Sequence, residues 1–230
     1  MTEPGSHKRR PRRPRTAAKA PQVPWSQLQL RYDPIEILSI DQIHAIHETA
    51  LTILEEVGMR VLEPNARGYL ATAGCKIDEG TMQARFDRAM VEELIARAPA
   101  EFSLTSRNPE RNLQLGGRNS VFSSVGGPAF CSDLDRGRRS GTYAEMCDYI
   151  KLVQSLNVIH QEGGGGFEAL DRPAATRHLD LYYAQTTLLD KNWQPWGLGT
   201  DCVIDALEMV AISLGTTREA LVDTPVFSCV

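Results

Sequence analysis

Residues 158–166, VIHQEGGGG, combine a short apolar strand pattern with a run of four glycines. On both sides of this stretch, segments with strand patterns alternate four times with segments that have the apolar spacing of helices. The expected strands lie over 121–125, 158–161, 193–198 and 225–230, and the expected helices begin at Thr142 or lie over about 173–189 and 201–214. This alternation predicts parallel strands joined by right-handed crossovers.

Both a doubly wound sheet and a β/α barrel satisfy that pattern. The first strand-to-helix junction lacks G-x-G-x-x-G, and no acidic residue stands where a dinucleotide ribose would need one, so we favour the barrel. A complete eight-fold barrel takes roughly 250 residues, whereas residues 121–230 hold about four β/α units. The prediction is therefore a partial TIM (β/α) barrel over 121–230, with uncovered edge strands and the look of a truncated chain.

Residues 25–120 are expected to form an N-terminal α+β region. Ser39 and Gln42 have the spacing of a capping box and begin an amphipathic helix that ends at Gly58. The remaining expected elements are a short helix ending at Gly74, a strand over 82–86, a helix capped by Asp87, and a hairpin of 102–106 with 113–115 around the turn 108–111.

Residues 1–24 form a disordered Arg/Pro-rich tail in this interpretation, because seven basic side chains and several prolines leave little to bury. Residues 25–230 carry 18 Lys/Arg and 28 Asp/Glu, so nucleic acid is not an expected partner. No apolar run is long enough to cross a membrane. Five scattered cysteines without a C-x-x-C pair fit a reducing, cytoplasmic location.

In a barrel, the carboxyl ends of the strands and the loops after them form the binding site. An acidic group and inward-facing indoles there would suit a cation, because aromatic faces attract ammonium groups. The expected substrate-binding residues are Ser124, Gly126, Gly127, Glu162, Gly163, Trp193 and Trp196. Packing is the alternative role of the tryptophans, and close packing that of the glycine run.

Other catalytic signals are weak, and the catalytic residues stay unassigned. His44 and His47 have a spacing that suits two metal ligands, but no third ligand is evident, so no metal site is predicted. No Ser-His-Asp order or carboxylate pair stands out. The glycine run allows backbone amides to approach a ligand, so the alternative function is a β/α-barrel enzyme with a phosphate-bearing substrate. The run lacks the Lys-Ser/Thr of a phosphate-binding loop, which makes this the weaker hypothesis.

Several long phrases resemble the trimethylamine methyltransferase family. They are SIDQIHAIH at 39–47, LTILEEVGM at 51–59, SRNPERNL at 106–113, CSDLDRGRRSGT at 131–142, PAATRHLD at 173–180 and DALEMV at 205–210. The resemblance covers about residues 25–230.

This resemblance implies a β/α barrel that passes a methyl group from a methylated amine to the Co(I) of a corrinoid protein. The amine is trimethylamine or a quaternary amine such as glycine betaine. Cobalamin would be supplied by the partner protein, with no cofactor bound tightly by this chain. A catalytically inactive fragment of such an enzyme is the alternative, and self-association into a homo-oligomer is left open.

Overall fold

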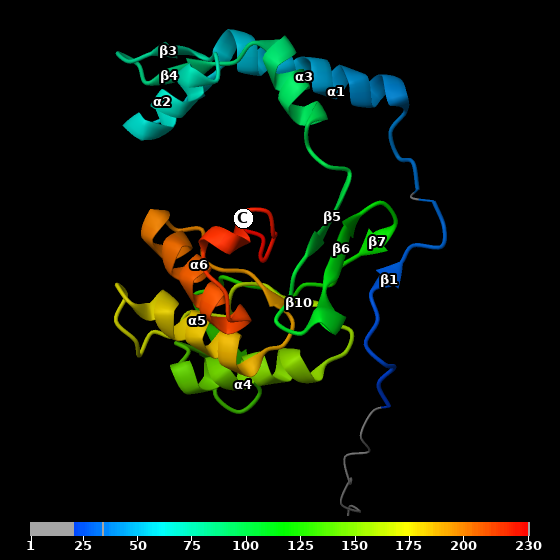
Figure 1. The fold of residues 1–230 in the computed structure, drawn as a ribbon, viewed down its shortest axis with the longest axis vertical. Coiled ribbons are helices and arrows are strands. Elements are labelled where there is room, and N and C mark those ends of the chain that lie inside the picture. The colour runs from blue at the N-terminus through cyan, green and yellow to red at the C-terminus, as the bar shows by residue number, and fades with distance from the viewer. Residues whose placement is uncertain (1–20, 34, 230) are drawn as a thin grey trace, which may run out of the picture.

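The computed structural model describes residues 21–33 and 35–229, and within them it is a mixed α/β structure with small sheets (Figure 1). The helices are α1 (Ile40–Thr52), continued by a π-helical turn (Ile53–Val57), α2 (Pro64–Thr72), α3 (Arg88–Ala96), α4 (Tyr143–Ser155), α5 (Arg177–Leu188) and α6 (Thr200–Leu214). The first strands are β1 (Leu28–Gln29), β2 (Met59–Arg60), β3 (Lys76–Asp78), β4 (Gln83–Arg85), β5 (Glu101–Leu104) and β6 (Leu113–Gly116). They are followed by β7 (Asn119–Ser120), β8 (Cys131–Asp133), β9 (Gly137–Arg139), β10 (Gln161–Glu162) and β11 (Asn192–Trp193).

The predicted disorder of residues 1–24 falls mainly on residues 1–20, which lie outside the described residues. The described chain begins inside the predicted tail, at Pro21. There, Gln22 donates to the carbonyl oxygen of Ser155, and Asn157 donates to the carbonyl oxygen of Val23. Residues 22 and 23, which the sequence assigned to the tail, therefore contact the region that follows α4.

The helix starts predicted from capping patterns are confirmed. The amide of Gln42 donates to the Ser39 hydroxyl at 3.2 Å, and the Gln42 side chain accepts from the amide of Ser39 at 2.9 Å. Thr142 and Glu145 form the same reciprocal pair at α4, and Asp87 caps α3. Each pair satisfies amide groups that the first helical turn leaves without partners.

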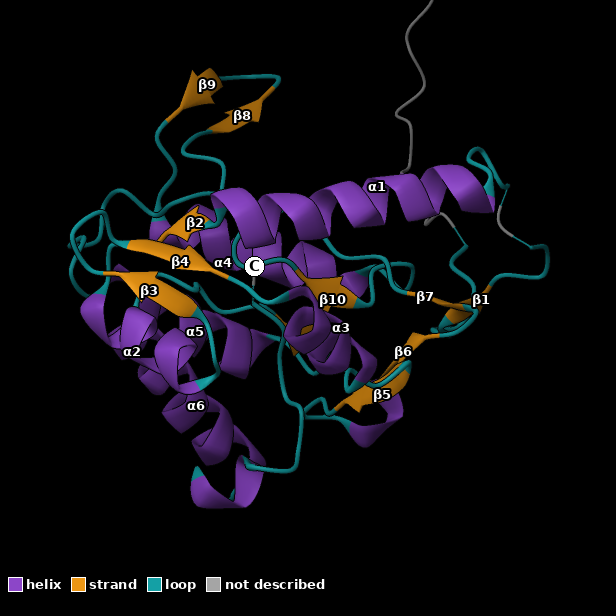
Figure 2. Cartoon of the chain, turned by 90° about the horizontal axis from the view of Figure 1, so that it is seen from above, coloured by secondary structure: helices purple, strands orange, loops and turns teal. Residues whose placement is uncertain are grey.

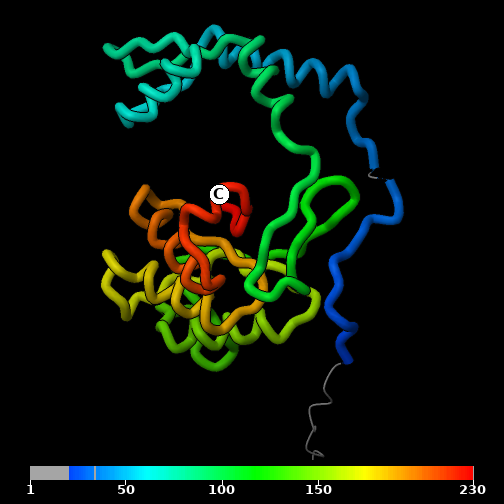
Figure 3. Tube along the Cα trace, viewed as in Figure 1, coloured from blue at the N-terminus to red at the C-terminus, as the bar shows by residue number. Residues whose placement is uncertain are grey.

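The α+β region consists of antiparallel pairings and short helices, as expected. Its sheets are β2-β4-β3, the hairpin β5-β6, and the pair β1-β7, which joins residues far apart in sequence (Figure 3). The predicted turn between β5 and β6 is a 3-10 turn at Pro109–Arg111. Among the described residues, the apolar side of α1 is mostly uncovered: Ile43 and Ile46 are 52% and 59% exposed, whereas Leu51 is buried.

The second half contains the predicted parallel pairing. Gln161 pairs with Ser123 on one side and with Asn192 on the other, both in parallel register. The amide of Ser124 donates to the Gln161 carbonyl at 3.0 Å, and the amide of Gln194 donates to the Glu162 carbonyl at 2.9 Å. Helices α4, α5 and α6 pack in sequence order beside these segments (Figure 1).

The strands are shorter than predicted, and no closed barrel is present in the described residues. The first expected strand, 121–125, is reduced to an isolated bridge at Ser123. Of the third, 193–198, only Trp193 belongs to a strand, because β11 covers Asn192–Trp193. The strand predicted over 225–230 is wrong for residues 225–229, which have no ladder. The Val226 carbonyl accepts from the side-chain amide of Asn192 at 2.8 Å and the Pro225 carbonyl accepts from the amide of Thr105 at 2.8 Å, so the segment bonds to β11 through a side chain and not through a ladder.

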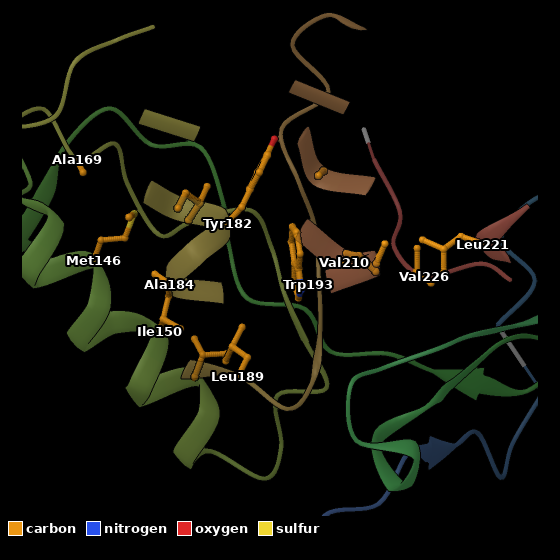
Figure 4. Packing of buried hydrophobic residues seen from close by; sticks show 14 residues of the cluster. Met146, Ile150, Ala169, Tyr182, Ala184, Leu189, Trp193, Val210, Leu221 and Val226 are labelled. Atoms are coloured by element: carbon orange, nitrogen blue, oxygen red, sulfur yellow. The ribbon is translucent and has the colours of Figure 1, made fainter. Parts of the chain in front are cut away.

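The hydrophobic core lies between the parallel segments and the three helices that follow them. Figure 4 shows Trp193 near Tyr182 and Val210, with Met146 and Ile150 of α4 on the other side of α5. All five side chains are at most 7% exposed. The core thus fixes the ends of the strands, from which the site loops emerge. In contrast, the hairpin β8-β9 projects from the body (Figure 2).

An extended segment before β1 is attached to the body through His160. The His160 Nδ1 atom accepts from the amide of Phe122 at 2.9 Å, so the ring proton lies on Nε2, which contacts the Ser26 carbonyl at 3.1 Å. Trp25 makes an edge contact with the ring at 5.8 Å. His160 is only 2% exposed, and burial holds its pKa below the usual value.

We expect this arrangement to make stability pH-dependent. In the unfolded chain His160 gains a proton near pH 6.5, whereas the folded chain resists protonation until a lower pH. The free energy of unfolding should therefore fall as pH decreases through this window, by at most about 1.4 kcal/mol per pH unit. Urea unfolding between pH 5 and 8 checks this. His160→Gln should flatten the dependence, and equal slopes for both proteins would contradict it.

Candidate active site

A cavity of about 320 Å³ lies at the carboxyl ends of the parallel segments. Three loops form its walls: one follows Ser123, one follows β10 and one follows β11. The lining residues are Gly126, Gly127, Gly163–Gly165, Phe167, Glu168 and Gln194–Leu198. This is the end of the strands at which β/α architectures bind their ligands.

Two of the expected glycines are needed because the first two loops touch through their backbones. A Cβ atom on Gly126 would lie 1.7 Å from the Gly163 carbonyl oxygen, and one on Gly163 would lie 2.0 Å from the Ser124 carbonyl oxygen. The Ser124 hydroxyl also accepts from the amide of Gly163 at 3.0 Å. Gly126, Gly127 and Gly163 line the cavity, while Ser124 ties the two loops together behind them.

Glu162 lies behind the cavity wall and is fully buried. One of its carboxylate oxygens accepts from the amide of Gly165 at 2.8 Å. The other accepts from the amide of Gly164 at 3.0 Å and from the Gln185 side-chain amide at 2.6 Å. Burial raises the pKa of Glu162, and the three donors act in the opposite direction.

These contacts bear on the alternative of a phosphate-bearing substrate. A phosphate-binding loop presents free backbone amides to its ligand. Here the amides of Gly164 and Gly165 donate to a carboxylate of the same chain, and that of Gly163 donates to Ser124. The glycine run therefore serves as a tightly held wall, and three of its donors are occupied.

The two expected tryptophans have different surroundings. Trp196 is half-buried and lines the cavity, with its indole nitrogen donating to the Gly164 carbonyl at 2.9 Å and its backbone amide donating to the Tyr182 hydroxyl at 3.1 Å. Trp193 is 7% exposed and lies in the core, with ring centres 5.5 Å from Tyr182 and 6.2 Å from Phe227. The structure thus brings Trp196 to the cavity and Trp193 to the packing beneath it.

Sequence reasoning missed four side chains of the lining: Phe167, Glu168, Gln194 and Pro195. The signal for the first two was their position directly after the glycine run. Glu168 is the single acidic lining residue, and the lining contains no Lys, Arg or His. Its carboxylate is 2.5 Å from the guanidinium of Arg177, which lies outside the lining.

The histidine pair on α1 lies away from this cavity. His47 is 3.9 Å from Glu92, and both are largely exposed. Within residues 21–33 and 35–229, no three His, Cys, Asp or Glu side chains gather in a way that could hold a metal ion. In the same residues, no helix combines the length and apolar character required to span a bilayer.

Comparison with known proteins identifies relatives of this chain. The sequence profile for trimethylamine methyltransferase (MTTB) matches residues 5–230. The glycine betaine methyltransferase of Desulfitobacterium hafniense (strain Y51) is 34% identical over 190 residues, which are 83% of this chain and 39% of that protein. The L-carnitine:corrinoid methyltransferase of Eubacterium limosum is 23% identical over 152 residues, 66% of this chain and 30% of that protein.

A further relative is the trimethylamine methyltransferase MttB of Desulfitobacterium hafniense (strain DSM 10664 / DCB-2), 30% identical over 142 residues, 61% of this chain and 27% of that protein. The chain spans less than half the length of these relatives. The match of the family profile to nearly all residues nevertheless agrees with the phrases in the sequence. On this evidence, the chain belongs to the trimethylamine methyltransferase family.

Proposed function

We propose that this chain contributes the substrate-binding part of a methyltransferase that moves a methyl group from a methylated amine to the Co(I) of a corrinoid protein. A quaternary amine such as glycine betaine is the preferred donor in this proposal, and trimethylamine is the alternative. The observation that carries it is the cavity at the strand ends, which has an aromatic wall, one carboxylate and no cationic side chain.

The composition of the cavity suits the chemistry of a quaternary ammonium group. When a nucleophile takes a methyl group from R–N(CH3)3⁺, the carbon–nitrogen bond breaks with its electron pair on nitrogen. The product is a neutral tertiary amine, which needs no proton to leave. The protein then has to bind, orient and desolvate the cation rather than supply an acid–base pair.

Four of the expected residues are proposed as direct contacts: Gly126, Gly127, Gly163 and Trp196. The Trp196 ring would face the methyl groups, because an aromatic face attracts an ammonium ion by about 0.5–2 kcal/mol. Ser124, Glu162 and Trp193 would support this wall from behind. Glu168 adds a negative charge at the cavity, although its pairing with Arg177 reduces that charge at the ligand.

The methyl acceptor belongs to a partner in this proposal. A corrinoid protein would bring cobalamin to the open cavity and supply a strongly nucleophilic metal, so the chain itself needs no tightly bound cofactor. The name of the carnitine relative includes a corrinoid acceptor, which supports this assignment.

We also propose that the parallel segments are part of a β/α barrel. Three successive segments pair in sequence order, each followed by a helix, and the cavity lies at their carboxyl ends. In barrels, neighbouring strands along the chain are neighbours in the sheet.

The proposed function is tested by binding and by transfer. With glycine betaine and a Co(I) corrinoid protein, the chain should form dimethylglycine and methylated corrinoid in equal amounts. Trp196→Ala should weaken betaine binding about two- to thirtyfold, since it removes the aromatic face. Isothermal titration calorimetry measures the affinity.

A neutral ligand provides the control for charge recognition. In 3,3-dimethylbutyrate a carbon atom replaces the nitrogen of glycine betaine, so shape and carboxylate are kept while the positive charge is lost. It should bind more weakly than betaine and respond little to Trp196→Ala. Equal affinity for both ligands, or unchanged betaine binding by the variant, would contradict recognition of the cation by Trp196.

A further inference from the structure

A buried carboxylate organises the wall of the cavity without belonging to it. Glu162 is fully buried at the end of β10, and Gln185 of α5, also fully buried, lies against it. Three N–H groups point at the two carboxylate oxygens, at 2.6–3.0 Å. Two of them are backbone amides of consecutive glycines with φ values of +94° and +90°, a region that other residues rarely adopt.

We infer that Glu162 is a positioning residue for the substrate site, acting through the glycine loop 163–166 and the indole of Trp196. The inference rests on the proposed function for the identity of the ligand, and on the geometry alone for the connection between these groups. It assigns Glu162 a role one layer behind the ligand.

The connection runs through the two glycines to both sides of the cavity. The carbonyl of Gly164 accepts from the indole nitrogen of Trp196 at 2.9 Å. The carbonyl of Gly165 accepts from the amide of Gly127 at 3.1 Å. Glu162 thus fixes Gly164 and Gly165 through their amides. The carbonyl groups of the same two glycines bind Trp196 on one side of the cavity and Gly127 on the other.

A carboxylate is the side chain suited to this position, because it accepts hydrogen bonds at both oxygens. Glutamine at 162 would offer one acceptor oxygen and turn an NH2 group toward another N–H donor. At least one buried donor would then lose its partner, which is costly in the interior. The loop would relax, and with it the orientation of Trp196.

In its ionised form, Glu162 would also favour a cationic ligand over an anionic one; burial, which raises its pKa, opposes that form, and the three N–H donors support it. The surroundings of Glu162 are buried, so its field is screened less than that of a surface carboxylate. Part of the charge is balanced by the three N–H dipoles. The same group would thus contribute both to the shape of the cavity and to its preference for a cation.

The test is Glu162→Gln, compared with Glu101→Gln, a matched change on an exposed strand position. Amide hydrogen exchange by NMR should show Gly164 and Gly165 exchanging at least tenfold faster in the first variant and unchanged in the second. The indole N–H resonance of Trp196, assigned with Trp196→Phe, should shift. Betaine affinity should fall about tenfold.

Unchanged exchange at both glycines together with an unmoved Trp196 resonance would overturn the inference. If Glu162→Gln does not fold, Glu162→Asp provides a second test: the shorter side chain draws the carboxylate away from the two amides that it accepts from and should speed exchange at the same two glycines. Equal protection there would equally overturn it. Failure of the wild-type chain to bind betaine, with altered exchange in Glu162→Gln, would instead contradict the proposed function and leave the positioning role standing.

Discussion

Replacing Gly163 with alanine is expected to lower the free energy of unfolding by about 3 kcal/mol. The added methyl group would lie 2.0 Å from the Ser124 carbonyl oxygen, and this oxygen belongs to a backbone that a side-chain rotation cannot move aside. The two loops must separate, which also strains the bond between the Gly163 amide and the Ser124 hydroxyl. Urea unfolding followed by circular dichroism measures the change.

Two other glycines provide matched controls for this substitution. Gly68 lies within α2 with no atom near the added methyl group, so Gly68→Ala should be neutral or stabilise by up to about 1 kcal/mol through helix propensity. A methyl group on Gly127 would also contact no other atom, but φ at this position is +87°. Any loss of unfolding free energy in Gly127→Ala should therefore come from backbone strain alone. A Gly163→Ala protein as stable as Gly68→Ala would show that the loops do not touch as described.

The sequence was most informative where local chemistry decides the structure. The capping residues Ser39, Asp87 and Thr142 predicted helix starts correctly, because a capping side chain bonds to an amide only three residues away. The order of the parallel segments also followed from the alternation of patterns. Family membership was predicted from the long phrases and is confirmed by the family profile.

The limits of the strands could not be predicted, because they depend on neighbours rather than on local preference. Residues 225–229 have an apolar, extended pattern, yet their contact with β11 uses the side chain of Asn192. The contacts of the exposed isoleucines of α1 could not be predicted either. The sequence pattern predicted that one side of the helix is apolar, but not which residues cover that side.

For the candidate site, sequence reasoning predicted the location better than the roles of individual residues. The rule that loops follow strand ends placed Gly126, Gly163 and Trp196 at the cavity. It did not distinguish a residue that faces the cavity from one that lies beneath it. In a strand only two residues long, alternate facing is a weak guide, and this affects Glu162 and Trp193 most.

Trp193→Ala is expected to lower the free energy of unfolding by about 3–5 kcal/mol, the range for removing a large aromatic from a core. The indole is 7% exposed and packs against Tyr182 and Phe227, so its loss leaves a cavity that the surrounding helices cannot close. Trp193→Phe should recover part of this stability, because a smaller ring keeps some of the contacts. Thermal and urea unfolding of both variants provide the measurement.

The matched variant Trp196→Ala separates packing from binding. Trp196 is half-buried at the cavity, so its loss should cost less stability than that of Trp193 and more betaine affinity. Trp193→Phe, assayed where it is fully folded, should bind betaine nearly as well as the wild-type chain. A ring buried beneath the cavity can influence the ligand only through the structure that it supports. If Trp193→Phe were as stable as the wild-type chain and yet failed to bind betaine, Trp193 would therefore be a direct substrate contact.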